Sequence, residues 1–196
     1  MKKIVLLLLT FTSLNVFASS SDEAIHRELR QAMVLVESAI NSGEYDKMLP
    51  VLSNDLRATP ITQEFIHGKE EIAPYFGKWF GKDKFLKSLN ISLSADTQTE
   101  LSTDRTWGVV YGKGREKYSL NDGRSYDIPT RWTATVVLEE GHWKIRTIHF
   151  GANFVDNPLI NEATQAINKV MYGAGVGGLL VGLILGFFLF RRKGKR

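Results

Sequence analysis

Two hydrophobic periods divide the chain into a helical first part and a strand-rich second part. Between residues 21 and 43, apolar side chains recur every three or four positions, which places them on one face of an α-helix. Ser21 is expected to cap this helix and Gly43 to end it. Further helical pieces are expected at residues 45–52 and after Gly68, with two short extended runs between them. The stripe of the first helix consists of Ile25, Leu29, Ala32, Met33, Val36 and Ile40.

From residue 85 onward the period changes to two. Leu89, Ile91 and Leu93 alternate with polar residues, which predicts a half-buried strand. Three more strands are expected between residues 105 and 154, joined by turns at Asp-Gly and Glu-Glu-Gly steps. Helices followed by long antiparallel strands predict an α+β domain in which the sheet covers the helices with one face.

The end of the chain predicts a membrane span. Residues 170–190 carry no charge, and at helical rise they reach about 31 Å, the thickness of the hydrocarbon core of a bilayer. Residues 158–169 continue the helical pattern upstream and form a juxtamembrane helix. Residues 191–196 are basic, which places them in the cytoplasm. A dinucleotide-binding loop at Gly173, Gly175 and Gly178 is excluded, because no strand precedes these glycines and no acidic residue follows them.

Small residues every four positions line one face of this span. Such a face lets a second helix approach closely, so we expect the helices to pair. The alternative is that glycine is simply frequent in membrane helices. The face consists of Ala174, Gly178, Gly182 and Gly186.

The first residues, 1–18, have the pattern of a secretory signal. Lys2 and Lys3 precede an apolar run, and Val16 and Ala18 occupy the small-residue positions before a cut. An uncleaved anchor is the alternative. With this signal and the basic tail, we expect residues 19–157 to form an exported domain on a bacterial plasma (inner) membrane, facing the periplasm or the exterior. The chain has no cysteine, so a disulfide framework is excluded.

The basic character of the chain follows from this topology. The formal net charge is +4 and the pI is about 9.2. Without the two basic residues of the signal and the five of the tail, 18 basic residues stand against 21 acidic ones. The exported part is therefore slightly acidic, and nucleic acid is not expected as a partner.

Three segments of the exported part resemble the nuclear-transport-factor-2-like, or SnoaL-like, domains. They read NSGEYDKMLPVLSNDLRA, FIHGKEEIAPYFGKWF and TATVVLEEGHWKIRTIHFG. The resemblance implies a strongly bent antiparallel sheet wrapped around N-terminal helices into a cone, a cystatin-like α+β roll, often with an apolar pocket at its wide end. Members include ketosteroid isomerase, polyketide cyclases, dehydratases and pure binding or assembly domains, so it does not fix an activity.

His149 is the candidate catalytic residue. By alternation it shares a strand face with Trp143 and Ile145, so an imidazole would enter an apolar pocket, where it could act as acid or base. The alternative is a hydrogen-bonded core histidine. Other residues are candidates for the pocket lining, although packing, capping or turn formation also explains them. They are Trp107, Tyr111, Trp132, Trp143, Asp55 and His67.

Other chemistries find little support in the sequence. The expected inward strand positions carry no carboxylate, which counts against the ketosteroid-isomerase reaction. The four histidines lack metal-ligand spacing, and no cofactor is expected.

Two functions therefore remain. The first is a membrane-tethered domain, homodimeric or a small homo-oligomer, that binds a small apolar ligand or a protein partner through its pocket or sheet face. The second is an isomerase, cyclase or dehydratase that acts on an apolar substrate through His149. We favour the first, because no acid–base pair stands out.

Overall fold

The first helix, α1 (Ser13–Ser42), buries the stripe that its sequence predicts. It begins before Ser21, so that residue lies inside the helix and the expected cap there is wrong. Gly43 follows α1 with a φ of +72°, a left-handed conformation that glycine adopts without strain. The side chains of α1 in or against the core are Ile25, Leu29, Ala32, Val36, Ala39 and Ile40.

The computed structural model describes residues 13–193. Most of the expected signal sequence and the last three residues of the basic tail lie outside this range. The described chain divides into two units, one up to Asn153 and one from Phe154 onward. We treat each unit by itself.

Short helices and long strands follow α1 in the first unit, in the predicted order. The strands are β1 (Leu52–Thr59), β2 (Ile66–His67), β3 (Leu86–Ala95), β4 (Glu100–Leu101), β5 (Trp107–Leu120), β6 (Ser125–Glu139) and β7 (His142–Ala152). The helices between them are the 3-10 turns η1 (Tyr45–Val51) and η2 (Lys69–Glu71) and the α-helix α2 (Ile72–Trp79).

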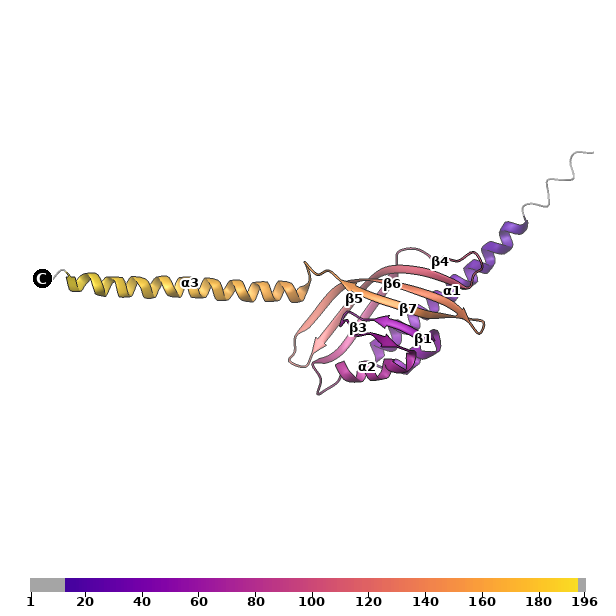
Figure 1. Ribbon diagram of the computed structural model, residues 1–196, viewed down its shortest axis with the longest axis horizontal. Coiled ribbons are helices and arrows are strands. Elements are labelled where there is room, and N and C mark those ends of the chain that lie inside the picture. Colours follow the sequence, from indigo (N-terminus) through magenta and orange to yellow (C-terminus); the bar gives the residue numbers. More distant parts are fainter. Residues whose placement is uncertain (1–12, 194–196) are drawn as a thin grey trace, which may run out of the picture. The chain divides into compact units, whose positions relative to one another are not determined.

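One curved sheet contains all seven strands. Its order is β2-β1-β7-β6-β5-β3, with β4 paired to β5. Neighbours are antiparallel, except that β1 runs parallel to β7. Helices α1 and α2 cover one face, which we call the helix side, and the other face is the open side (Figure 1). The predicted fold class, an α+β roll, is confirmed.

The core fills the space between the helices and the sheet. Leu56 of β1 is 1% exposed, and the Tyr45 and Phe76 rings stack with their centroids 3.7 Å apart. Truncating a side chain buried like Leu56 to alanine typically costs about 2–5 kcal/mol. This packing buries most of the apolar side chains on the helix side.

Strand β7 contains an irregularity that decides which side chains face inward. Ile145 pairs with Val136, but Thr147 pairs with Thr135, so Arg146 is an extra residue. Such a bulge reverses the alternation of side chains that follow it. Trp143 and Ile145 face the helix side before the bulge, and Ile148 faces it after the bulge.

The second unit contains α3 (Pro158–Lys193), a single unbroken helix. Within the described residues, it is the one helix whose length and composition suit a membrane crossing, over Pro158–Phe187. The expected juxtamembrane and membrane-spanning segments are thus continuous. The helix is compatible with a single-pass anchor.

Candidate functional site

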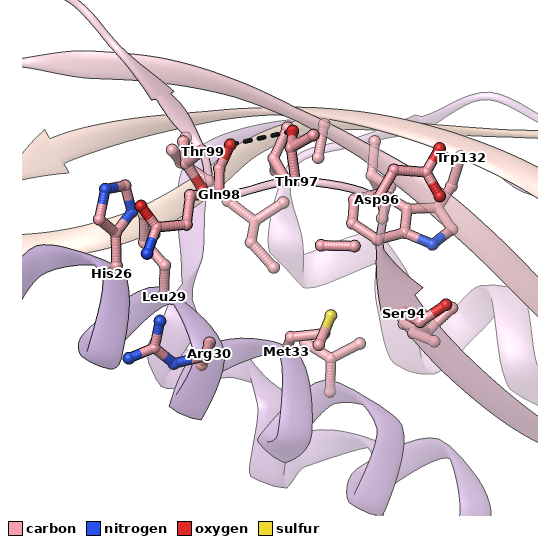
Figure 2. A pocket seen from close by; sticks show the side chains of 18 residues that line it. His26, Leu29, Arg30, Met33, Ser94, Asp96, Thr97, Gln98, Thr99 and Trp132 are labelled. Atoms are coloured by element: carbon pink, nitrogen blue, oxygen red, sulfur yellow. Dashed lines mark hydrogen bonds between the residues drawn. The ribbon is translucent and has the colours of Figure 1, made fainter. Parts of the chain in front are cut away.

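A pocket of about 450 Å³ lies between α1 and the helix side of the sheet. We call it the α1 pocket. Figure 2 shows α1 along one side of it, the segment from Ser94 to Thr99 across from the helix, and the Trp132 indole at one end. Its volume is in the range of small-molecule sites. Its deeper lining is apolar and includes Leu29, Met33, Val36, Leu93, Val110, Trp132, Ala134, Val136, Ile145 and Ile148.

Trp132 is fixed in the wall of this pocket. It is 5% exposed, and its Nε1–H donates a 2.9 Å hydrogen bond to the Lys113 carbonyl oxygen. The ring lies over Gly112 on the neighbouring strand, where any side chain would overlap it. A rigid aromatic wall with its polar atom already satisfied offers a ligand mainly apolar contact.

Polar side chains form the rim of the α1 pocket. His26 and Arg30 come from α1, and Asp96, Thr97 and Gln98 come from the opposite segment (Figure 2). Two of them are held by ion pairs whose partners lie outside the lining, Arg30 to Glu23 at 2.6 Å and Asp96 to Arg131 at 2.5 Å. The hydrogen bond from Arg131 lowers the pKa of Asp96. An apolar interior with a polar rim suits a mainly apolar ligand.

A second, smaller cavity of about 80 Å³ lies deeper in the core. We call it the inner chamber. Its lining is apolar except for Glu116, Tyr118 and Tyr75. It shares three lining side chains with the α1 pocket, so the two spaces adjoin there. The shared residues are Val36, Ile145 and Ile148.

Glu116 is a buried carboxylic acid in this chamber. It is 4% exposed, and its Oε2 accepts a 2.5 Å hydrogen bond from the Tyr118 hydroxyl. Burial raises the pKa of Glu116, and hydroxyls of Tyr118 and Thr130 partly oppose the shift. Neither its other oxygen, Oε1, nor Oγ1 of Thr130 makes a well-formed hydrogen bond in the described part of the chain, so the Thr130 hydroxyl acts on Glu116 only as a neighbouring dipole.

The tyrosines of the chamber are also buried. Burial raises the pKa of Tyr75 to about 12, although a hydrogen bond with Thr62 opposes the rise. Burial also raises the pKa of Tyr118, and the neighbouring Glu116 adds to this. Both tyrosines therefore stay protonated at neutral pH. The chamber offers hydroxyl groups and one carboxyl in apolar surroundings.

The four aromatic residues expected to line the pocket lie in different parts of the first unit. Trp132 lines the α1 pocket. Trp143 faces the helix side but is 4% exposed within the core and lines neither cavity. Trp107 and Tyr111 lie on the open side of β5, Trp107 with 49% exposure, so their expected place in the pocket is wrong. The helix side of β5 begins instead with Gly108, Val110 and Gly112, which leave room for larger neighbours.

His149 lies on the open side of β7 and is exposed. Its expected inward orientation is wrong, because the bulge at Arg146 reverses the alternation that Trp143 and Ile145 begin. Its neighbour across the sheet is Thr133, which is also exposed.

Asp55 and His67 lie at the surface as well. Asp55 pairs with Arg146 at 2.9 Å, and it lines a separate, polar pocket and neither of the two apolar cavities. The backbone N–H of His67 donates to Glu71 Oε2 at 2.7 Å, which is a structural contact at the start of η2. The expectation that these two residues line the apolar pocket is wrong.

Sequence reasoning missed Glu116, the one carboxylate among the residues that line the inner chamber. The expectation of no inward carboxylate depended on the wrong face of β5. The run from Gly112 to Leu120 carries the signal, because Glu116 shares its parity with the apolar Tyr118 and Leu120. In the described residues, no group of three or more His, Asp or Glu side chains could hold a metal ion.

No protein-family model matches the chain, and no curated protein matches it in sequence. Solved structures match its fold. A proposed scytalone dehydratase from Novosphingobium aromaticivorans is 11% identical, with a TM-score of 0.55 over 69% of this chain and 89% of the other. A type 2 hexachlorocyclohexane dehydrochlorinase is 15% identical, with a TM-score of 0.54 over 72% and 89%. An uncharacterized protein with a cystatin-like fold from Caulobacter vibrioides is 15% identical, with a TM-score of 0.53 over 74% and 99%.

These likenesses concern the fold. The fold is a cystatin-like α+β roll. The matched structures share this fold with the chain. At such low identity they do not carry over a substrate or a catalytic residue.

Proposed function

We propose that the first unit binds a small apolar molecule in the α1 pocket. The observation that carries this proposal is a cavity of about 450 Å³ with an apolar interior and a polar rim. Burial of apolar ligand surface there contributes about 25 cal/mol per Å². Ligand binding is also compatible with enzymes among the proteins of similar fold, such as the dehydrochlorinase.

The proposed location is the surface of a membrane. In this proposal, α3 crosses a bacterial plasma membrane once, with residues 191–196 in the cytoplasm and the first unit exported. The support is the length and apolar composition of Pro158–Phe187. Four residues separate Asn153 from Pro158, the start of α3. In this proposal α3 tethers the first unit to the membrane, where apolar molecules concentrate.

Two substitutions on one strand test the binding proposal. Ala134 of β6 lines the α1 pocket, whereas its neighbour Thr133 lies exposed on the open side. Ala134→Phe fills the pocket, and Thr133→Phe adds the same side chain outside it. The full chain is purified from its native membranes, and bound small molecules are detected by native mass spectrometry. We expect an adduct with the wild type and with Thr133→Phe, and none with Ala134→Phe.

A stability measurement accompanies this comparison. Both variants are expected to unfold within a few degrees of the wild type, since each added ring enters a cavity or solvent. The same adduct on both variants, or none on the wild type, contradicts the proposal.

The second function, an enzyme that uses His149, has lost its geometric support. The imidazole lies on the open side, and the α1 pocket lies on the helix side. We therefore expect His149→Ala to leave ligand binding unchanged. Loss of binding in this variant contradicts the assignment of the site to the α1 pocket.

A further inference from the structure

A further pocket, of about 770 Å³, is lined by cationic side chains of the open side of the sheet. These are Lys113 and Arg115 of β5 and Arg131 of β6. They alternate with buried residues along their strands, which places them on the open side. None of the described residues that line this pocket is acidic. We call it the basic pocket.

Two of these cations are direct neighbours across the strands. Lys113 lies opposite Arg131 in the pairing of β5 with β6. Like charges at opposed positions of neighbouring strands destabilise a sheet. Within residues 13–193, the ammonium group of Lys113 makes no ion pair, whereas both arginines of the pocket make one. The described chain therefore leaves one positive charge of the pocket without an ion-pair partner.

The two arginines are held by acids that lie outside the pocket lining. Nη2 of Arg131 donates to Asp96 at 2.5 Å. Nη2 of Arg115 donates to Asp127 at 2.6 Å. Each bond uses one of the several N–H donors of a guanidinium group, so other donors remain for a ligand. The two arginine side chains are 64% and 54% exposed, so the acids orient them without closing the pocket.

We propose that the basic pocket binds a phosphate group, with Lys113, Arg115 and Arg131 as the donors. A phosphate group offers several charged acceptor oxygens, which suit the point charge of a lysine and the planar forks of two arginines. Ser92 and Ser94 of β3 lie beside these cations in the register and add hydroxyl donors to the lining. None of the three cations lines the α1 pocket, so this inference does not depend on the proposed function.

The positive charge is confined to a small area of the open side. In one direction along β5 and β6, the next open-side positions are Tyr111 and Thr133, which are uncharged. In the other direction, Lys117 stands opposite Asp127, so the two charges compensate each other. A nucleic acid or another polyanion needs a longer row of cations. The basic pocket therefore suits one phosphate group.

Gly151 of β7 leaves space beside Arg131. The two residues are opposed in the register, so a side chain at position 151 would stand on the same face, in the pocket. Apart from its chain neighbours, the one described atom near an added Cβ is the carbonyl oxygen of Arg131, at 4.0 Å. A substitution at Gly151 can therefore fill or charge the pocket without disturbing the core.

Phosphate binding by the full chain tests this inference. The protein is purified in a neutral detergent, and inorganic phosphate is titrated by calorimetry in chloride buffer at constant ionic strength. Lys113→Gln and Lys117→Gln each remove one cation from the open side of β5, but only Lys113 lines the pocket. We expect Lys113→Gln to weaken phosphate binding roughly tenfold, the effect of one hydrogen bond to a charged group. Lys117→Gln should leave the affinity within about twofold, because the charge that it removes is screened at the surface.

A second pair of variants acts through position 151. Gly151→Glu places a carboxylate beside Arg131 and should abolish phosphate binding. Gly151→Gln adds a side chain of the same size without the charge and should bind phosphate more tightly than Gly151→Glu. Thermal unfolding gives an independent measurement, since phosphate should raise the Tm of the wild type relative to chloride and should not raise that of Gly151→Glu.

Two water-soluble probes distinguish the source of the phosphate group. Glycerophosphoglycerol is the headgroup of phosphatidylglycerol without its acyl chains, and glycerol 3-phosphate is a soluble monoester. Tighter binding of the first assigns the pocket to a lipid headgroup, and tighter binding of the second assigns it to a soluble phosphate compound.

Three results would overturn the inference. The first is that the wild type does not bind phosphate. The second is that Lys113→Gln and Lys117→Gln lose the same affinity, as a diffuse surface charge would require. The third is equal binding by Gly151→Glu and Gly151→Gln. None of them affects the proposed function, because Ala134→Phe tests that function on the other face of the sheet.

Discussion

The hydroxyl of Tyr118 donates a 2.5 Å hydrogen bond to Oε2 of Glu116, two positions earlier on the helix side of β5. Burial raises the pKa of this carboxyl above its ordinary value near 4.5. At a pH between the ordinary pKa of the unfolded chain and the raised pKa of the folded chain, Glu116 is protonated in the folded chain and ionised in the unfolded one. The contribution of Glu116 to stability is therefore present at low pH and is lost as the pH rises through the folded pKa.

Glu116→Gln removes this proton and keeps the shape of the side chain. The free energy of unfolding of the wild type minus that of Glu116→Gln should fall as the pH rises from about 4 to 9, by about 1.4 kcal/mol for each unit by which the pKa is raised. Urea unfolding followed by tryptophan fluorescence measures it. Carboxylates with lowered pKa values, such as Asp96, act in the opposite direction but equally in both proteins. Glu100→Gln, at an exposed position, is the control and should show no such change with pH. If the free energy of unfolding of the wild type minus that of Glu116→Gln rises with pH, the raised pKa of Glu116 is contradicted.

Gly112 and Trp132 are the second pair on which the site depends. A Cβ atom on Gly112 would lie 2.5 Å from Cζ2 of Trp132 and closer still to the Ser94 carbonyl oxygen. Neither the ring, held by Lys113, nor the strand can move away freely. We expect Gly112→Ala to lower the free energy of unfolding by about 1–3 kcal/mol, the usual effect of overpacking. Chemical denaturation measures the loss, and near-ultraviolet circular dichroism reports the displaced indole.

Gly77→Ala is the matched control for this prediction. Gly77 lies inside α2, and no atom lies within 4 Å of the position of an added Cβ. Alanine should raise stability there by about 0.5–1 kcal/mol, because it favours the helix. Equal effects of the two substitutions would contradict the packing argument for the pocket wall.

Local patterns predict the elements of this fold well, because they depend on neighbours in sequence. The stripe of α1, the alternation of β3 and the turn at Gly123 each occur as predicted. The parallel pairing of β1 with β7 is different, since it joins distant segments. The hydrophobic pattern of neither strand indicates that the two strands pair, or that they run parallel.

The site could be predicted only in part, because its orientation depends on partner strands. The alternation from Trp143 to His149 continues in the sequence, but the register with β6 adds a bulge at Arg146. On β5, Trp107 and Tyr111 look more apolar than the glycines between them. The glycines nevertheless face inward, because side chains such as Trp132 from β6 fill the space above them.

The proposed topology predicts which introduced cysteine an impermeant reagent can label from outside the cell. The chain has no cysteine, so single substitutions report one position each. Thr133→Cys stands on the exposed open side of the first unit, and Lys195→Cys stands in the basic tail. In intact spheroplasts, an impermeant maleimide should label Thr133→Cys at once and Lys195→Cys only after detergent is added. Both chains should stay with the membrane in carbonate. The reverse labelling order, or release by carbonate, contradicts a single crossing with the tail inside.

We propose that α3 pairs with a second copy through its small-residue face. At Gly178, Gly182 and Gly186, nothing else in the described chain lies within 4 Å of an added Cβ, so the groove is open to a second helix. Gly182→Ile fills the groove and should shift the full chain from dimer to monomer in single-molecule photobleaching in lipid. Gly177→Ile adds the same side chain about 140° around the helix from Gly182 and should leave the dimer intact. If the two variants behave alike, the glycines serve the membrane helix in some other way and the pairing proposal fails.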